Sequence, residues 1–213
     1  MGSSTDVAFT PAVKAEQQRR GSRAAYARLE EKGGWSTTVT EDLAAFIANA
    51  RSFYLATATK KGQPYIQHRG GPKGFLRVLD ANTLAFADFA GNRLYITSGN
   101  LAENPQAFLF LMDYANRRRV KIWGTAKVVV DDPDLKARLT TDRYAARVEQ
   151  SIVFRIEAWD TNCPQHIPQL LPAEDVADAF DALKARIAAL ETENAALRQG
   201  HHPTEPLKGE TQQ

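Results

Sequence analysis

The segment best suited to chemistry is a short glycine-rich run that carries two cations. It comprises Gln67, His68, Arg69, Gly70, Gly71, Pro72, Lys73 and Gly74. Its glycines and proline favour a turn that exposes backbone amides beside Arg69 and Lys73, and such a nest can hold a phosphate. The alternative is a wide hairpin loop with solvated charges, and the segment in isolation fits either description.

Two further basic groups lie where the apolar pattern predicts strand ends. Asn92 and Arg93 directly follow one apolar run, and another run opens with Arg117, Arg118 and Arg119. A basic run is usually a solvated turn or a nucleic-acid patch. The formal net charge is only +2, from 27 basic and 25 acidic residues, which disfavours nucleic acid. Three cation-bearing strand ends together indicate a compact anion such as a phosphate ester.

The single cysteine, Cys163, lies three residues before His166. The pair could be half of a metal site, but zinc requires three or four ligands and the other histidines offer no matching pair, so we predict no metal. It could also be a nucleophile with its base, which requires a cationic or helix-start setting. We favour a third interpretation, in which the polar side chains of this segment close over a bound ligand. Dinucleotide fingerprints, Walker loops and nucleophile elbows are absent from the sequence.

The composition fits a globular chain of 213 residues, one domain with extensions. With 43% hydrophobic and 24% charged residues, it excludes a disordered chain, a collagen-like repeat and a disulfide scaffold. No window approaches the ~18 apolar residues of a membrane span, and the first residues do not resemble a secretory signal. One cysteine cannot form an internal disulfide, which favours a reducing, cytoplasmic setting.

The apolar pattern predicts a mainly β protein with flanking helices. Runs rich in aromatic and β-branched residues, with hairpin-length gaps, predict at least six strands: Phe53–Thr59, Tyr65–His68, Phe75–Leu79, Leu84–Phe89, Phe108–Met112, Val120–Val130 and Ser151–Trp159. Few helices separate them, so an antiparallel barrel is favoured over a doubly wound parallel sheet. Helices are predicted from Thr10 to about Glu31, after Thr40 and over Leu135–Leu139, with residues 1–9 as a loose tail.

A heptad pattern follows Pro172. Leucine or valine occupies the d positions, and the a positions hold Phe180, Ile187 and Asn194. Leucines at d with one asparagine at a favour two parallel helices in register, and the charged residues at e and g agree. The alternative is an amphipathic helix packed on its own domain, because about three heptads is the minimum for a coiled coil. Glycine and proline after residue 198 predict a disordered tail.

The stretch Phe53–Val130 resembles the flavin-nucleotide-binding split-barrel proteins related to pyridoxamine 5'-phosphate oxidase. The matching segments are YLATATKKGQPYIQHRGGPKGFLRVLD, TLAFADFAGNRLYITSGNLAENP and RRRVKIWGTAKVV. The segments FTPAVKAEQQRRGSRAAY and WDTNCPQHI resemble a subgroup with an Arg-Gly-Gly-Pro turn, so the resemblance spans about Phe9 to Ile167. It implies a six-stranded antiparallel split barrel that forms a homodimer and binds FMN in grooves made by both subunits.

The resemblance also implies roles for particular residues. Arg69 matches a strand arginine near the FMN phosphate or ribityl chain, and Asn92 and Arg93 match the Ser-Arg-Lys phosphate contacts of the oxidase. The implied cofactor-binding set is Gln67, His68, Arg69, Gly70, Gly71, Lys73, Asn92, Arg93, Asn100, Arg117, Arg118 and Arg119. The oxidase closes with an Arg-Leu-His-Asp-Arg-like motif that binds its substrate, and this chain has Asn-Cys-Pro-Gln-His there. The resemblance therefore does not carry the substrate specificity.

These observations predict an N-terminal tail and helices over residues 1–50 and an FMN-binding split barrel over 51–170. A C-terminal helix over 173–198 and a tail over 199–213 follow. The leading hypothesis is an FMN-dependent oxidoreductase with an unassigned small-molecule substrate and electron donor. Its catalytic residues are unassigned, and the candidates for its substrate side are Cys163, Gln165 and His166.

Two other functions stay open at this point. The first is a non-catalytic flavin carrier or sensor, with the C-terminal helix as its output. The second is a nucleic-acid-binding barrel that uses the arginines. We expect a cytoplasmic homodimer that binds neither nucleic acid nor a membrane.

Overall fold

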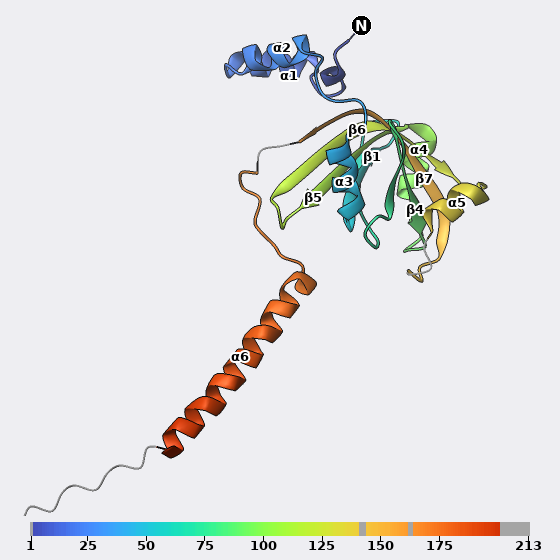
Figure 1. The fold of residues 1–213 in the computed structure, drawn as a ribbon. Coiled ribbons are helices and arrows are strands. Elements are labelled where there is room, and N and C mark those ends of the chain that lie inside the picture. Colours follow the sequence, from blue (N-terminus) through green and yellow to red (C-terminus); the bar gives the residue numbers. More distant parts are fainter. Residues whose placement is uncertain (1, 141–143, 162–163, 201–213) are drawn as a thin grey trace, which may run out of the picture. The chain divides into compact units, whose positions relative to one another are not determined.

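The computed structural model describes residues 2–140, 144–161 and 164–200. The chain divides into two compact units, Met1–Gln169 and Leu170–Gln213. The first unit contains a curved sheet with several helices, and the second contains one long helix (Figure 1). None of the helices in the described ranges combines the length and the apolar character that a membrane span requires.

In its described residues the first unit is built on one antiparallel sheet of seven strands. In sheet order the strands are β2 (Pro64–Gly70), β1 (Ser52–Ala58), β5 (Gln106–Asp113), β6 (Arg118–Val129), β7 (Val148–Thr161), β4 (Thr83–Phe89) and β3 (Leu76–Asp80). The predicted antiparallel architecture is confirmed, and all seven apolar runs form strands. The resemblance implied six strands. The structure has one more, and β3 pairs with β4 alone at the edge of the sheet.

The sheet curls around its core. Phe53 of β1 meets Phe86 of β4 edge to face, with 5.0 Å between the ring centroids, although three strands separate β1 from β4 in the sheet order. Gly124 allows a register shift where β6 crosses β7, because a Cβ there would collide with the carbonyl oxygen of Arg155. The curvature brings the two ends of the sheet together, as in a split barrel.

Helix α3 (Glu41–Asn49) contributes to the core. As predicted, it begins after Thr40, whose hydroxyl accepts a hydrogen bond from the Leu43 backbone N–H at 3.2 Å. Leu43, Phe46 and Ile47 are buried on one face of this helix. They pack with alternate strand residues, among which the following are less than 2% exposed: Phe53, Leu55, Leu84, Phe86, Leu109, Leu111, Ile122, Ile152 and Phe154.

The N-terminal region differs from the single helix predicted up to Glu31. Helices α1 (Pro11–Arg19) and α2 (Arg23–Glu31) are separated by a turn in which Gly21 has a φ of 78°. A left-handed glycine ends a helix because it lets the backbone turn away, and the prediction of one helix was wrong. The prediction of a loose tail was also wrong, because η1 (Ser4–Val7) is a 3-10 turn with a capping box and a buried Thr5.

Two short helices connect strands in the first unit. Helix α5 (Pro133–Leu139) was predicted, and it is capped by Asp132, whose carboxylate accepts a hydrogen bond from the Leu135 N–H at 2.8 Å. Helix α4 (Ile96–Glu103), between β4 and β5, was not predicted. Its first residues follow Tyr95, which has a φ of 51°. Tyrosine is not a typical capping residue, so the sequence carried no signal for the start of α4.

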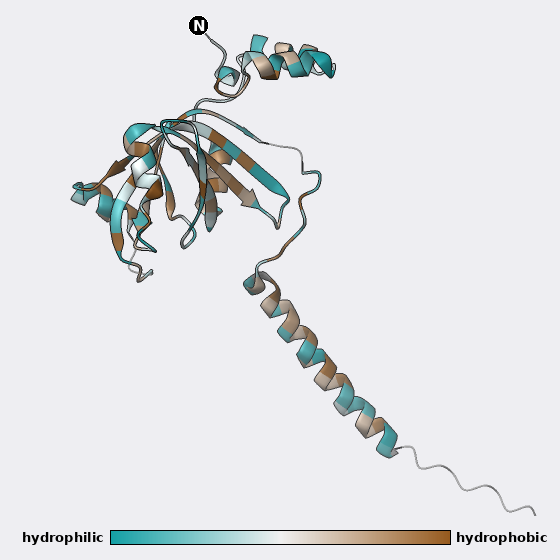
Figure 2. Cartoon of the chain, turned by 180° about the vertical axis from the view of Figure 1, so that it is seen from behind, coloured by the Kyte–Doolittle hydropathy of each residue, from teal (hydrophilic) through white to brown (hydrophobic). Residues whose placement is uncertain are grey.

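The second unit consists of α6 (Ala173–Gly200) and the residues around it. Hydrophobic and hydrophilic residues alternate along this helix (Figure 2). Within this unit the apolar side chains stay exposed, from 40% for Val176 to 62% for Leu183. The predicted helix over 173–198 is present and extends to Gly200, so the predicted tail does not begin at residue 199, and its remainder over 201–213 lies outside the described residues.

Candidate functional site

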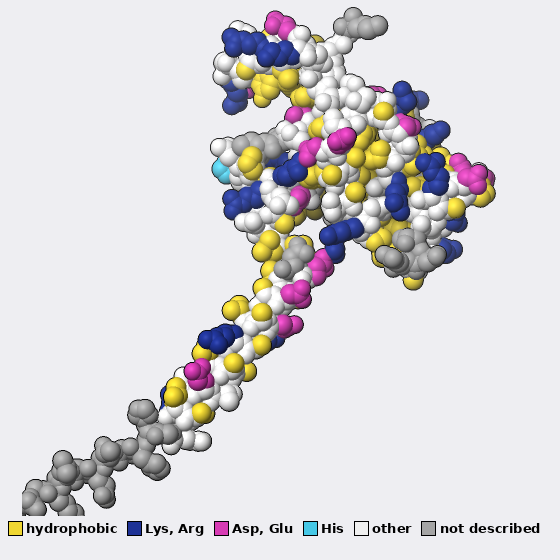
Figure 3. Space-filling model, in the orientation of Figure 1, with side chains coloured by type: hydrophobic (Ala, Val, Ile, Leu, Met, Phe, Trp, Pro, Cys, Tyr) yellow, Lys and Arg dark blue, Asp and Glu magenta, His cyan; other side chains and the backbone are white. Residues whose placement is uncertain are grey.

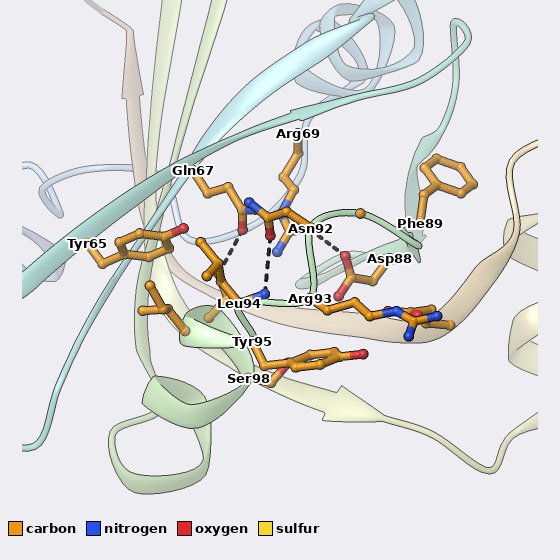
Figure 4. Close-up of a pocket in the computed structure, with 14 residues that line it drawn as sticks. Tyr65, Gln67, Arg69, Asp88, Phe89, Asn92, Arg93, Leu94, Tyr95 and Ser98 are labelled. Atoms are coloured by element: carbon orange, nitrogen blue, oxygen red, sulfur yellow. Dashed lines mark hydrogen bonds and ion pairs between the residues drawn. The ribbon is translucent and has the colours of Figure 1, made fainter.

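A pocket lies where one face of β2 meets the connection from β4 to α4 (Figure 4). Its lining combines polar, charged and aromatic side chains: Tyr65, Gln67, Arg69, Asp88, Phe89, Gly91, Asn92, Arg93, Leu94, Tyr95, Ile96, Thr97, Ser98 and Glu149. Four residues of the predicted cofactor-binding set are thus brought together: Gln67, Arg69, Asn92 and Arg93.

The period of two along β2 explains how this strand serves the pocket. Tyr65, Gln67 and Arg69 are alternate residues and therefore share one face of the strand. The hydroxyl of Thr97 donates a hydrogen bond to Gln67 Oε1 at 3.0 Å. This bond connects the edge strand β2 to the first turn of α4 and fixes one side of the pocket.

A polar network crosses the pocket. Arg69 Nη1 donates to one oxygen of Asp88, and the two side chains point toward one another in Figure 4. Gln150 Nε2 donates to the other Asp88 oxygen at 2.8 Å and to Ser98 Oγ at 2.9 Å. Arg69 Nε is buried and has no hydrogen-bond partner among the described residues. The network fixes β2, β4, β7 and α4 relative to one another.

The segment between β4 and α4 has an unusual backbone. Arg93 and Tyr95 have φ values of 58° and 51°, in the left-handed region that residues with a Cβ rarely adopt. Such conformations cost about 1–3 kcal/mol and cluster at functional sites. The Leu94 N–H donates to Asn92 Oδ1 at 3.2 Å, which stabilises the turn. The strain therefore coincides with the wall of the pocket.

Helix α4 turns its N-terminal end to the pocket. Ile96, Thr97 and Ser98 are its first residues and line the pocket, and no side chain in the described part of the molecule caps it at Tyr95. The first N–H groups of a helix lack intrahelical acceptors and carry a partial positive charge. This end of the pocket therefore presents backbone donors suited to an anion.

The charges of the lining are mostly paired. Arg69 pairs with Asp88, and Glu149 pairs with Arg147 at 2.9 Å. Arg93 is exposed, and within the described ranges it makes no ion pair. The pocket thus combines one unpaired guanidinium with an uncapped helix N-terminus, an arrangement that favours a dianion such as phosphate.

Several residues of the predicted set lie outside the pocket. His68 is on the opposite face of β2, where its ring meets Tyr54 edge to face at 5.7 Å. Gly70 ends β2, and the Gly71 N–H donates to the Arg51 carbonyl at 3.0 Å. Lys73 is exposed in the turn before β3. The predicted nest is therefore a turn beyond the end of β2, and of the two cations assigned to it only Arg69 lines the pocket.

The remaining residues of that set make structural contacts. Asn100 is buried in α4, and its Nδ2 donates to Thr57 Oγ1 at 3.0 Å. Arg117 donates to Gln169 Oε1 at 3.2 Å, and Arg118 pairs with Asp42 of α3 at 2.8 Å. Arg119 follows in β6, and none of the three arginines lines the pocket.

The candidates for the substrate side are only partly described. Gln165 and His166 are exposed and do not line the pocket, and Cys163 lies outside the described residues. The part of the chain that the structure describes contains no cluster of three histidine, cysteine, aspartate or glutamate residues that could hold a metal ion.

The family model described as pyridoxamine 5'-phosphate oxidase matches residues 39–194. The chain belongs to this family. The match includes every strand of the sheet and all residues that line the pocket. A comparison with curated proteins gave no match.

Several solved structures have a fold similar to that of this chain but a low sequence identity to it. HupZ from Group A Streptococcus is 18% identical, with a TM-score of 0.48, and the alignment covers 62% of this chain and 99% of HupZ. A provisionally assigned pyridoxamine 5'-phosphate oxidase from Lactobacillus delbrueckii is 26% identical, with a TM-score of 0.44 and coverages of 59% and 95%. HutZ, the heme storage protein from Vibrio cholerae, is 15% identical, with a TM-score of 0.40 and coverages of 55% and 87%.

The sequence patterns did not identify several pocket residues of this member of the pyridoxamine 5'-phosphate oxidase family. Tyr65 could have been found, because it is two residues before Gln67 on the same strand. Asp88 is a carboxylate inside the apolar run of β4, and a buried charge indicates a partner. Tyr95 and Ser98 gave no signal, because their place in the pocket depends on α4.

Proposed function

We propose that the protein is an FMN-binding flavoprotein that holds the FMN phosphate beside Arg93 and the start of α4. The observation that carries this proposal is that one pocket is lined both by Arg93, an arginine without an ion pair among the described residues, and by the uncapped first turn of α4. A phosphate dianion there would accept charge-assisted hydrogen bonds from Arg93 and from backbone N–H groups. FMN ends in such a phosphate, whereas FAD would need an adenine site for which the sequence has no signature.

The rest of the lining supports a flavin ring. Tyr65, Phe89 and Tyr95 give the pocket aromatic surface beside its polar groups. Flat aromatic ligands pack well against such side chains, while a few polar groups fix their orientation. Gln67 and Asn92, which also line the pocket, offer amide groups that can bind the hydroxyls or heteroatoms of the ligand. The charge and the aromatic surface of the lining therefore support FMN as the ligand.

The proposed activity is that of an oxidoreductase with a substrate other than pyridoxamine 5'-phosphate. Bound FMN would supply the transfer of electrons or hydride, and the protein would supply position, electrostatics and access. Arg93 and the backbone of α4 would bind the phosphate, while the Arg69–Asp88 pair would hold the wall against which the ligand lies. The chain has Asn162–His166 where the oxidase has its substrate-binding motif, and this difference supports a different substrate.

We further propose that the barrel works as a homodimer in the cytoplasm. Leu94 and Tyr95, which line the pocket, are 62% and 53% exposed, and Ile66 of β2 is 60% exposed. Exposed apolar side chains of this size are typical of a protein interface. A single cysteine agrees with a reducing compartment.

The test is the absorption spectrum of the purified full chain, followed by chromatography and mass measurement of any released flavin. The proposal expects flavin bands and FMN. Protein that stays colourless and leaves the fluorescence of added FMN unchanged would overturn it. Reduction of the bound flavin by a nicotinamide cofactor, with turnover of an acceptor, would support the oxidoreductase. Binding without turnover would indicate a carrier or sensor.

A further inference from the structure

Helix α6 carries a narrow apolar stripe that none of the described residues of its own unit covers. The stripe follows alternating steps of four and three residues: Val176, Phe180, Leu183, Ile187, Leu190, Asn194 and Leu197. Its apolar members are 40–62% exposed, and Figure 3 shows hydrophobic side chains along the helix with charged ones between them. Apolar surface of this extent is unfavourable in water, so we expect another surface to cover the stripe.

We propose that the stripe is covered by α6 of a second copy of this chain, in a parallel two-stranded coiled coil. The apolar positions form a seam at a and d, which is narrower than the face of a helix packed on a globular domain. Leucine or valine fills every d position, and Phe180 and Ile187 fill two of the a positions. This inference goes beyond the proposed flavin function and does not depend on it.

The flanking charges complement those of a second copy. In a parallel pair, a g residue faces the e residue five positions later on the other helix. Arg186 then faces Glu191 of the partner subunit, and Glu193 faces Arg198 of the partner subunit. Each pair occurs twice by symmetry, and Ala179 at g faces Lys184 of the partner subunit without repulsion. A second copy therefore fits the seam in both shape and charge.

Asn194 decides the direction of the two helices. An antiparallel pair in which Ile187 opposes Leu190 of the partner subunit would also place opposite charges together, because Lys184 would then meet Glu191 of the partner subunit. In that arrangement the Asn194 amide would face the apolar Leu183 of the partner subunit and lose its hydrogen bonds, which is costly. In the parallel arrangement the two Asn194 amides face one another and can pair.

A coil of this length depends on help from the rest of the chain. About three heptads are marginal in water, because helix nucleation and association both cost entropy. Any other contact between two chains raises the effective concentration of the helices and favours the coil. The parallel direction also suits a twofold dimer, in which both copies present the start of α6 from equivalent positions.

The first experiment compares Leu190→Lys with Thr192→Lys in the full chain by sedimentation over a range of concentrations. Both variants add the same charge to α6, but only Leu190 lies in the seam, whereas Thr192 is on the outer face. We expect Leu190→Lys to raise the dissociation constant of the dimer about a hundredfold and Thr192→Lys to leave it unchanged. Equal behaviour of Leu190→Lys and the unaltered chain would overturn the proposal.

The second experiment tests whether the two α6 helices run parallel, and its readout does not depend on the stability of the dimer. In a Cys163→Ser background, Leu197→Cys places a thiol in the seam near the end of α6, and Thr192→Cys places one outside it. The parallel coil brings the two thiols introduced by Leu197→Cys together, so mild oxidation should give covalent dimers with this variant and not with Thr192→Cys. An antiparallel pair places position 197 opposite Phe180 of the partner subunit. Absence of the Leu197→Cys dimer, or equal yields from both variants, would overturn the parallel coil.

Discussion

Arg69 and Asp88 form an ion pair beside the pocket, with side chains that are only 13% and 11% exposed. Arg69 belongs to β2 at one end of the sheet, and Asp88 belongs to β4, next to the last strand at the other end. The pair therefore spans the place where the curled sheet meets itself. It also neutralises a guanidinium that would otherwise be buried without a counter-ion, which is unfavourable.

The ion pair should contribute to stability. We expect Asp88→Asn to lower the free energy of unfolding by about 3 kcal/mol, because it leaves the Arg69 charge buried and unpaired. Urea denaturation of the two proteins measures this difference. The matched control is Asp42→Asn, whose partner Arg118 is exposed, and this change should cost less than about 1 kcal/mol. Equal losses in the two variants would show that the Arg69–Asp88 pair has no special role.

The hydrogen bond between Asn100 and Thr57 should stabilise the fold without serving the cofactor. Thr57→Val removes the acceptor of the buried Asn100 amide, so we expect a loss of about 1–3 kcal/mol in unfolding free energy. Neither residue lines the pocket, and the affinity for FMN should stay unchanged. Thr59→Val is the control, because it removes a hydrogen bond that is solvent-exposed, from the Gln63 N–H at 3.1 Å, and should cost less. Weaker FMN binding with unchanged stability would instead assign Asn100 to the cofactor.

The N-terminal region should loosen in acid before the sheet does. The hydrogen bond from Lys14 lowers the pKa of Asp6. Partial burial raises the pKa of Glu30, but hydrogen bonds from Lys14 and Arg23 outweigh it and lower that pKa below its ordinary value. Carboxylates with lowered pKa values stabilise the fold at neutral pH and lose that effect as the pH falls through their folded values.

Hydrogen exchange of residues 2–34 measures this loosening. Exchange should accelerate relative to β6 as the pH is lowered below about 4, after correction for intrinsic rates. Lys14→Met should reduce the pH dependence, because it removes the hydrogen-bond donor shared by both carboxylates. Parallel acceleration in the N-terminal region and in β6 would contradict this explanation.

The protein should make little or no pyridoxal phosphate from pyridoxamine 5'-phosphate. A second phosphorylated ligand needs its own cationic site, and among the described lining residues only Arg93 is an unpaired cation, which FMN would occupy. The measurement is product formation by the full chain with saturating FMN, beside an authentic oxidase as control. Steady production at about 1 turnover per second would be typical of an enzyme and would contradict the prediction.

The sequence revealed the strands because their runs are rich in aromatic and β-branched residues, and in β1 and β5 the buried residues also recur with a period of two. Arg93 was found because a cation directly after a strand is a local feature. Asp88 was missed because its partner Arg69 is 19 residues earlier and meets it only when the sheet curls. Helix α4 was missed because it starts at a left-handed tyrosine, a conformation that tertiary structure imposes. The sequence thus predicted features that depend on neighbouring residues, but not the contacts that form when the sheet curves.

The most direct test of the account is a pair of titrations, with FMN and with riboflavin, on the unaltered protein, on Arg93→Ala and on Arg28→Ala. Riboflavin lacks the phosphate, so the unaltered protein should bind FMN more tightly. Arg93→Ala should weaken FMN binding about tenfold to a hundredfold and leave riboflavin binding unchanged, while Arg28→Ala, at an exposed arginine of α2, should change neither. Equal affinities for FMN and riboflavin in the unaltered protein, or an unchanged FMN affinity in Arg93→Ala, would contradict the proposed phosphate site.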